Sequence, residues 1–324
     1  MNIAICLVGF AVSFGLLVAT MPVFIKALKR HNISQTVSEY AIEEYKQKEK
    51  TPIMGGLLFV VIPVLVALVL NINNLGDKKM LFAVLSYVLY CSVGFIDDYI
   101  VIIKHDNEGL SPRIRLIMEF VYTVILYLLF NDVIETKITI PFANICIQIM
   151  PIIFVGFMAL LYMAEANAVN FTDGMDGLCA GVSFISLLPF VAYCLIYKEK
   201  GLAIFLFAIL GGLLGYLKFN YHPAKIFMGD SGSLALGALF AALGIVLDKT
   251  IALFVIGGVF VIEMFCVCLQ LSSVKLFHKR VFSYTPIHYA FSLKGYKETR
   301  IVPSFYLVAL VLAILGYLIG INTL

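Results

Sequence analysis

The sequence predicts an all-helical integral membrane protein with about ten transmembrane helices. Three observations indicate this fold class. Hydrophobic residues make up 62% of the 324 positions and charged residues only 13%, which is about half the charged share of a soluble domain. The mean hydropathy is +1.00. Long apolar runs without charge follow one another along the whole chain, and roughly 17–25 such residues suffice to cross a bilayer as a helix.

We expect one polytopic membrane domain over residues 1–324. Its predicted spans are 3–25, 53–70, 80–96, 116–130, 147–164, 178–197, 202–218, 232–247, 251–271 and 303–321. The fourth span carries Glu119 near its start, and the ninth contains Glu263. The runs are continuous and do not alternate between apolar and polar residues, a pattern that favours helices over a membrane barrel.

The distribution of basic residues predicts the orientation. Ten spans place both termini on one side, and the loops 26–52, 97–115, 218–231 and 272–302 on the other side carry most of the 23 Lys and Arg residues. The positive-inside rule makes these loops cytoplasmic and both termini extracellular. The outer loops are short, although Glu135–Phe142 can form a small hairpin. Because the inner loops hold the unusual polar residues, we expect the active site on the cytoplasmic face.

Two adjacent carboxylates, Asp97 and Asp98, stand at the inner end of the third span. They are costly at a membrane boundary unless a cation or a proton offsets their repulsion. Two interpretations are open at this point: a Mg²⁺ site with phosphate oxygens, or an ordinary solvated helix end.

A second polar segment, Asn167–Gly177, is predicted as a loop between the fifth and sixth spans. Its Asn, Thr and Asp side chains offer hard oxygen ligands, and its glycines permit tight turns and close approach of a ligand. An N-capping loop would explain one acid, but not Asp173 and Asp176 together with Asn167 and Asn170.

Two further inner segments complete a polar constellation. Gly229–Ser233 precedes a predicted helix and is similar to a phosphate-cradling turn, in which Asp230 is either a metal ligand or a simple N-cap. The loop 272–302 is basic and contains His278 and His288. Such a loop can reflect topology or lipid contact alone, but beside acidic loops it can supply cations for a pyrophosphate. Together these segments favour Mg²⁺-assisted transfer of a phosphorylated group to a lipid phosphate.

At these residues the chain resembles the polyprenyl-phosphate N-acetylhexosamine-1-phosphate transferase superfamily. Asp97-Asp98, Asn167–Gly181 and Phe227–Gly237 carry this resemblance. Within the superfamily, the chain resembles the phospho-N-acetylmuramoyl-pentapeptide transferases in four further segments, which are Lys50–Gly56, Gly109–Leu116, Gly257–Gln270 and Thr285–Val302.

The resemblance implies a reaction in the bacterial plasma membrane. UDP-N-acetylmuramoyl-pentapeptide would donate its phospho-sugar to undecaprenyl phosphate, giving lipid I for peptidoglycan synthesis and releasing UMP, with Mg²⁺ required. It also implies a homodimer and a target of nucleoside antibiotics. The net charge of +3 is too small to suggest a nucleic-acid partner.

Site residues follow from the resemblance by position. Asp230 is the expected Mg²⁺ ligand and Asp97 the expected base toward the lipid phosphate; Asp98 and His288 are the other expected catalytic residues. Phe227 is suited to stacking on uracil. The expected substrate-binding residues are Lys48, Arg115, Asn167, Asn170, Phe171, Asp173, Gly174, Asp176, Asn220, Phe227 and Gln270.

The sequence departs from the family pattern at several positions, and these keep an alternative open. His288-Tyr289-Ala290 stands where the family has three consecutive histidines, and Arg115 stands where it has a lysine. Lys50 stands where the family has a glycine, and Ile53 where it has a threonine. A sister enzyme that transfers N-acetylglucosamine-1-phosphate to the same lipid is therefore the alternative, although the segment Thr285–Val302 favours the muramoyl donor.

A cation-coupled transporter is the third hypothesis. Transporters place their acids near the bilayer midplane, where only Glu263 lies. A glutamate there needs a partner or a water-filled cleft, and Gly257-Gly258 would ease a bend in its helix.

Overall fold

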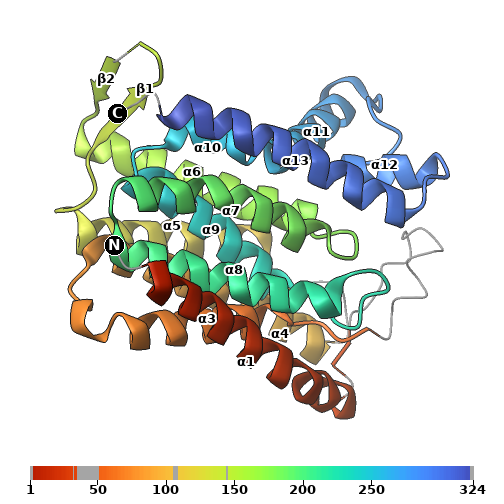
Figure 1. Cartoon of the computed structure of the whole chain (residues 1–324). Coiled ribbons are helices and arrows are strands. Elements are labelled where there is room, and N and C mark those ends of the chain that lie inside the picture. Colours follow the sequence, from red (N-terminus) through yellow and green to blue (C-terminus); the bar gives the residue numbers. More distant parts are fainter. Residues whose placement is uncertain (1–2, 32, 35–50, 105–108, 144, 322–324) are drawn as a thin grey trace.

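A computed structural model describes residues 3–31, 33–34, 51–104, 109–143 and 145–321. These residues form helices, joined by short turns and one two-stranded sheet (Figure 1). The elements are α1 (Ile3–Arg30), α3 (Gly56–Leu70), the 3-10 helix η1 (Ile72–Asn74), α4 (Lys78–Lys104), α5 (Pro112–Phe130), β1 (Lys137–Ile140), β2 (Ile145–Gln148), α6 (Pro151–Thr172), α7 (Leu178–Ile196), α8 (Lys200–Asn220), α9 (Asp230–Val246), α10 (Thr250–Ile256), α11 (Gly258–Phe277), α12 (Ile287–Leu293) and α13 (Glu298–Ile321).

The predicted class, an all-helical integral membrane protein, is confirmed. Among the described residues, seven helices are long and apolar enough to cross a membrane: α1, α4, α6, α7, α8, α11 and α13. Helices α3 and α9 are apolar but shorter. Each of the ten predicted spans corresponds to a helix, except that the ninth is divided into α10 and α11. The break falls at Gly257, as the glycine pair indicates.

Helix α9 forms the centre of the bundle. Every residue from Ser231 to Val246 is buried, and α4, α6 and α3 pack around it. Small residues allow this close packing: a Cβ on Gly237 would lie only 2.4 Å from the Cα of Ala166 in α6. By contrast, α1 and α13 bury only 22% of their most apolar windows, so both lie at the periphery with apolar faces suited to lipid.

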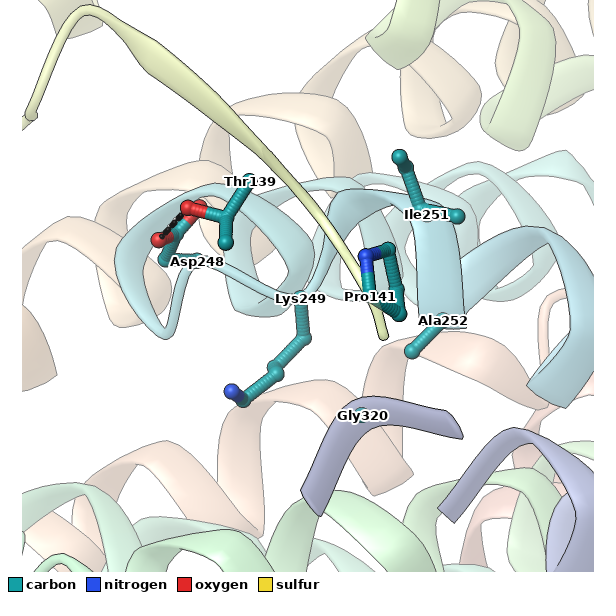
Figure 2. Close-up of a pocket in the computed structure, with 7 residues that line it drawn as sticks. All are labelled: Thr139, Pro141, Asp248, Lys249, Ile251, Ala252 and Gly320. Carbon is teal, nitrogen blue, oxygen red and sulfur yellow. Dashed lines mark hydrogen bonds between the residues drawn. The ribbon is translucent and has the colours of Figure 1, made fainter. Parts of the chain in front are cut away.

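The two ends of the bundle differ in character. The first and last described residues lie at the end that carries the hairpin of β1 and β2, whereas α12 lies at the opposite end (Figure 1). The hairpin is antiparallel, with Lys137 opposite Gln148. The hydroxyl of Thr139 donates to Asp248 beside a small pocket, in which Lys249 points away from this pair (Figure 2). A hairpin was expected within Glu135–Phe142, but only its first strand lies there; the second strand, β2, lies further along the chain, and α6 starts after it at Pro151, four residues later than the predicted fifth span.

Two segments that the sequence predicts on the cytoplasmic side are more helical than expected. Helix α6 continues to Thr172, so that Asn167, Asn170 and Phe171 lie on its last turns instead of in a loop. The side chain of Asn167 donates to the carbonyl of Met163 at 2.7 Å, which satisfies it within the helix. Helix α4 likewise runs past Asp97 and Asp98 to Lys104, because apolar residues follow the two acids and continue the helical face.

Candidate active site

The N-terminus of α9 rests directly on α4. Gly94 makes this contact possible, since a Cβ there would lie 2.1 Å from the backbone oxygen of Asp230. Gly229, with φ 76°, turns the chain into α9. Asp98, which is 4% exposed, accepts hydrogen bonds from the backbone N–H groups of Asp230 at 3.0 Å and Ser231 at 3.1 Å. A carboxylate is favoured at a helix N-terminus, so Asp98 fixes the first turn of α9.

The side chain of Asp230 is held from two sides. Its Oδ2 accepts a hydrogen bond from Nη1 of Arg115 at 2.8 Å, and its Oδ1 accepts one from Nδ2 of Asn170 at 2.8 Å. Asn170 also donates to the hydroxyl of Ser233 at 2.9 Å, one turn further along α9. The carboxylate is thus oriented, yet its side chain remains 25% exposed. Such an oxygen can serve as a ligand for a hard cation such as Mg²⁺.

Arg115 connects α5 to this site. Its Nε donates to Glu119 at 3.3 Å, one turn further along α5. Within the described part of the chain, Nη2 of Arg115 and Oε2 of Glu119 are buried without a hydrogen-bond partner. An unmade hydrogen bond to a buried charged group is expensive, so the guanidinium has a donor available for an anionic ligand.

Asp97 faces the segment that leads into α5. Its Oδ1 accepts the backbone N–H of Leu110 at 2.9 Å. Gly109 packs against the same carboxylate, because a Cβ there would lie 2.3 Å from Oδ2. Asp97 is also close enough to Asp230 for the two carboxylates to repel each other. One oxygen of Asp97 is therefore fixed by the backbone, within the electrostatic reach of Asp230.

The turn between α6 and α7 brings a further acid to the site. Burial, and the carboxylates of Asp230 and Asp176, raise the pKa of Asp173 to about 7 from its ordinary value. Gly174 lies against α12, and a Cβ there would meet Nε2 of His288 at 2.2 Å. The hydroxyl of Tyr289 donates to the carbonyl of Gly174 at 3.0 Å. The turn between α6 and α7 therefore packs on α12, and together they form one wall of the candidate site.

Glu263 of α11 orients His288. Both side chains are fully buried, and Nδ1 of His288 lies 3.0 Å from Oε1 of Glu263. Glu263 also accepts the backbone N–H groups of Ile287 at 2.6 Å and His288 at 3.3 Å. The carboxylate therefore favours a proton on Nδ1 and turns Nε2 toward Gly174. The expectation that an intramembrane glutamate has a partner is confirmed, and the partner is α12.

Two predicted substrate-binding residues hold loop backbones. Asn220 accepts the N–H of Gly177 at 3.0 Å and donates to the carbonyl of Ile226 at 3.0 Å. Gln270 accepts both backbone N–H groups of the 281–282 segment, at 2.9 and 3.0 Å. Both side chains fix the turns that border the site.

The segment before α3 pairs with the segment before α9. The N–H of Phe227 donates to the carbonyl of Pro52 at 2.8 Å, and its own carbonyl accepts the N–H of Gly55 at 2.8 Å. The ring of Phe227 is half-buried. Lys48, which precedes this segment, lies outside the described residues.

Comparisons with known proteins identify the family. A model of glycosyl transferase family 4 matches residues 80–248, which extend from α4 to the turn after α9. A phospho-N-acetylmuramoyl-pentapeptide-transferase of Staphylococcus aureus (strain bovine RF122 / ET3-1) is 38% identical over 309 residues, covering 93% of this chain and 95% of the relative. The enzyme of that name from strain MSSA476 is 37% identical over 306 residues, with the same coverage.

The chain belongs to the phospho-N-acetylmuramoyl-pentapeptide transferase family. The family resemblance predicted from the sequence motifs is thus confirmed, and the chain is a multi-pass membrane transferase. In this family member, Asp97 and Asp173, which come from different parts of the chain, each lie within electrostatic range of Asp230.

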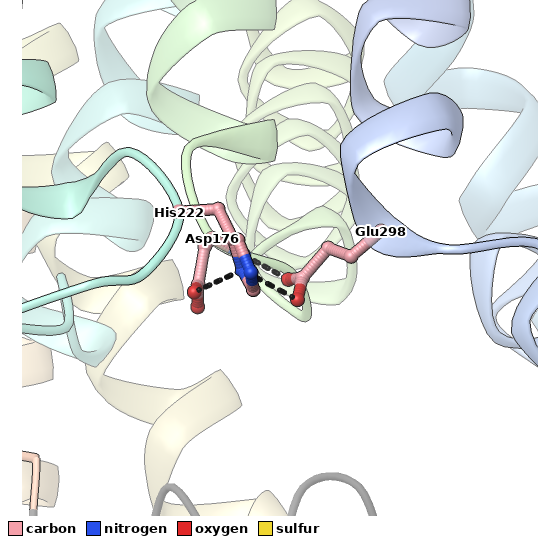
Figure 3. Close-up of side chains that lie close together, drawn as sticks. All are labelled: Asp176, His222 and Glu298. Atoms are coloured by element: carbon pink, nitrogen blue, oxygen red, sulfur yellow. Dashed lines mark hydrogen bonds and ion pairs between the residues drawn. The ribbon is translucent and has the colours of Figure 1, made fainter.

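Three polar residues in this region of the transferase were not among the predicted site residues. Glu119, which was expected only as a charge within a span, accepts a hydrogen bond from Arg115. His222 and Glu298 contact Asp176, one of the predicted substrate-binding residues (Figure 3). The position of His222 two residues after Asn220, within the same polar run, was the available signal.

Proposed function

We propose that the chain transfers phospho-N-acetylmuramoyl-pentapeptide from its UDP conjugate to undecaprenyl phosphate, with lipid I and UMP as products. The observation that carries the proposal is the contact of α4 with α9, which brings Asp97 close to Asp230 beside Arg115. The names of the relatives specify the transferred group.

We further propose that the chain crosses the bacterial plasma membrane ten times, with both termini outside and the acids on the cytoplasmic side. The opposite placement of the hairpin and α12 supports this orientation, as does the excess of Lys and Arg in the loops predicted to be inside. A homodimer is part of the same proposal.

Mg²⁺ is the proposed cofactor, and the residues present fit it. Mg²⁺ usually takes only one or two protein carboxylates and completes its coordination with phosphate oxygens and water. The oriented and partly exposed carboxylate of Asp230 suits this role. When bound, the ion would neutralise charge on the pyrophosphate.

The other residues of the site would each have a separate role in the transfer. Asp97, whose Oδ1 is fixed by Leu110, would accept the proton of the lipid phosphate on Oδ2. The deprotonated phosphate oxygen would attack the sugar-linked phosphorus, and UMP would leave. The unpartnered Nη2 of Arg115 would donate to a pyrophosphate oxygen as negative charge develops. Asn170 would keep Asp230 from rotating.

Donor choice is the decisive test. The purified chain in detergent would receive undecaprenyl phosphate and Mg²⁺, with UDP-N-acetylmuramoyl-pentapeptide or UDP-N-acetylglucosamine in separate reactions, and UMP and the lipid product would be quantified. We expect product from the muramoyl donor only, and none from Asp230→Asn. Product from UDP-N-acetylglucosamine alone would identify the sister enzyme. Folded protein that is inactive with both donors would overturn the proposed reaction.

A further inference from the structure

Glu119 is an acid inside the apolar helix α5, and its side chain is 0% exposed. Its backbone is held by neighbours, since its carbonyl accepts the hydroxyl of Tyr90 in α4 at 3.1 Å and that of Thr123 at 2.9 Å. A buried charge costs free energy unless a partner offsets it. The carboxylate of Glu119 has such a partner in Arg115.

The guanidinium of Arg115 lies between two carboxylates. Its Nε donates to Oε1 of Glu119 at 3.3 Å, and its Nη1 donates to Oδ2 of Asp230 at 2.8 Å. In an arginine, Nε and Nη2 form one edge, which fits both oxygens of a carboxylate. Only half of this pair is made, because Nη2 of Arg115 and Oε2 of Glu119 are buried without a hydrogen-bond partner among the described residues. These two unpartnered atoms are the ones that would complete the pair.

The contact with Arg115 also affects how Asp230 can bind a cation. Oδ1 of Asp230 accepts the amide of Asn170, and Oδ2 accepts Arg115, so both oxygens of the proposed Mg²⁺ ligand already have a donor. A guanidinium and a divalent ion compete for Oδ2, because both carry positive charge. Mg²⁺ therefore binds more easily if Arg115 has another acceptor, and Oε2 of Glu119 is one.

We propose that Glu119 is a positioning residue, which receives the guanidinium of Arg115 when Mg²⁺ binds to Asp230. The inference rests on the part of the proposed function that makes Asp230 the Mg²⁺ ligand. Nη1 of Arg115 would leave Oδ2 of Asp230, and Nη2 would donate one N–H to Oε2 of Glu119. Because Nη2 carries two N–H groups, the second remains for a pyrophosphate oxygen. Glu119 thus favours Mg²⁺ binding and keeps the charge of Arg115 beside the donor.

The Mg²⁺ dependence of thermal unfolding, measured on the full chain in detergent without substrates, tests this role. Mg²⁺ should raise the Tm of the wild type, because it binds the folded state. Glu119→Gln removes the charge and can place an NH₂ group where Nη2 needs an acceptor, so Arg115 should stay on Asp230. About tenfold more Mg²⁺ should then be needed for half of the shift in Tm. The control Glu199→Gln, which breaks a pair with Lys79 at the start of α4, should keep the wild-type Mg²⁺ dependence.

Arg115→Lys separates positioning from charge alone. A lysine ammonium lacks the planar edge that pairs with both oxygens of Glu119. In the Arg115→Lys background, Glu119→Gln should therefore change the Mg²⁺ requirement by less than about twofold. The same tenfold change in both backgrounds would show that Glu119 acts through its negative charge only, and would overturn the positioning role.

Two other results would also overturn the inference. One is a wild-type Tm that does not respond to Mg²⁺, and the other is a wild-type Mg²⁺ requirement in folded Glu119→Gln. If Glu119→Gln does not fold, Glu119→Met, which fills similar space without an acceptor, takes its place in both backgrounds.

The donor test of the proposed function is separate from this one. Product from the muramoyl donor, with an unchanged Mg²⁺ requirement in Glu119→Gln, would remove the role of Glu119 and leave the reaction intact. Folded wild-type protein that releases no UMP, but shows the tenfold change in Glu119→Gln, would remove the reaction and leave the role of Glu119 at Arg115.

Discussion

The backbone N–H of Asp230 donates a 3.0 Å hydrogen bond to the carboxylate of Asp98. Asp98 therefore holds the backbone of Asp230, at the start of α9, in place. Asp97 instead accepts the backbone N–H of Leu110 and packs against Gly109. Two adjacent carboxylates that look equivalent in the sequence therefore have different surroundings, and we expect their substitution to have different effects.

We expect Asp98→Asn to lower both the stability of the protein and its rate of UMP release. The amide keeps one acceptor oxygen and turns an NH₂ group toward a backbone N–H of α9. A buried unsatisfied N–H costs about 1–3 kcal/mol, so Tm should fall by several degrees and UMP release by at least about tenfold. Asp132→Asn, at an exposed pair with Lys78, is the control and should do neither. Unchanged Tm in Asp98→Asn would contradict the assigned contact.

Asp97→Asn should leave the fold intact and stop turnover. The amide oxygen can still accept the N–H of Leu110, so Tm should stay within about one or two degrees. Loss of the base should reduce UMP release by about 10²–10⁴-fold, while binding of the UDP donor, measured by calorimetry, persists. Turnover near the wild-type rate would remove Asp97 from the role of base.

Glu263→Gln tests whether His288 needs its orienting partner. Glutamine cannot accept both the imidazole N–H and the two backbone N–H groups that Glu263 accepts. We expect kcat to fall by about 10–100-fold with little change in KM, because His288 loses its fixed orientation. Steady-state kinetics on protein of checked Tm provide the measurement. A change confined to KM would indicate that the pair serves donor binding.

The pH dependence of stability should report on Asp173. Its pKa of about 7 in the folded protein lies above the value of about 4 for a solvated carboxyl. The folded state therefore holds a proton that the unfolded state has lost, and stability falls as pH rises through this window. Between about pH 5 and pH 8, the Tm of Asp173→Asn should therefore fall by several degrees less than the Tm of the wild type. An identical decline would place the titrating group elsewhere.

Local sequence patterns predicted much of the fold. Apolar runs located the helices, because burial in lipid requires continuous hydrophobic segments. Gly257-Gly258 indicated the division between α10 and α11, and Gly229–Ser233 indicated the start of α9. The end of α6 was misplaced because asparagine and threonine usually favour loops, whereas here Asn170 is needed on the helix to reach Asp230.

Long-range contacts account for what the sequence did not predict. Asp176 lies 46 positions from His222 and 122 from Glu298, and no local periodicity encodes such a meeting. The function of Asp98 as an acceptor for α9 has the same origin, since its partners lie more than 130 positions away. The motif indicated that the acids matter, but only the packing of α4 on α9 shows which atoms they face.

At Gly94, the backbone of α4 touches the backbone of α9 with no side chain between them, and this limits which substitutions the site can accept during evolution. A single added carbon there would collide with the chain at Asp230, so this wall has no side chain that mutation could reshape in small steps. The wall formed by Gly174 and α12 is different, because Glu263, His288 and Tyr289 hold it through side chains. We expect related enzymes that use other donors to differ in α12, whereas the contact between Gly94 and Asp230 should vary very little among them.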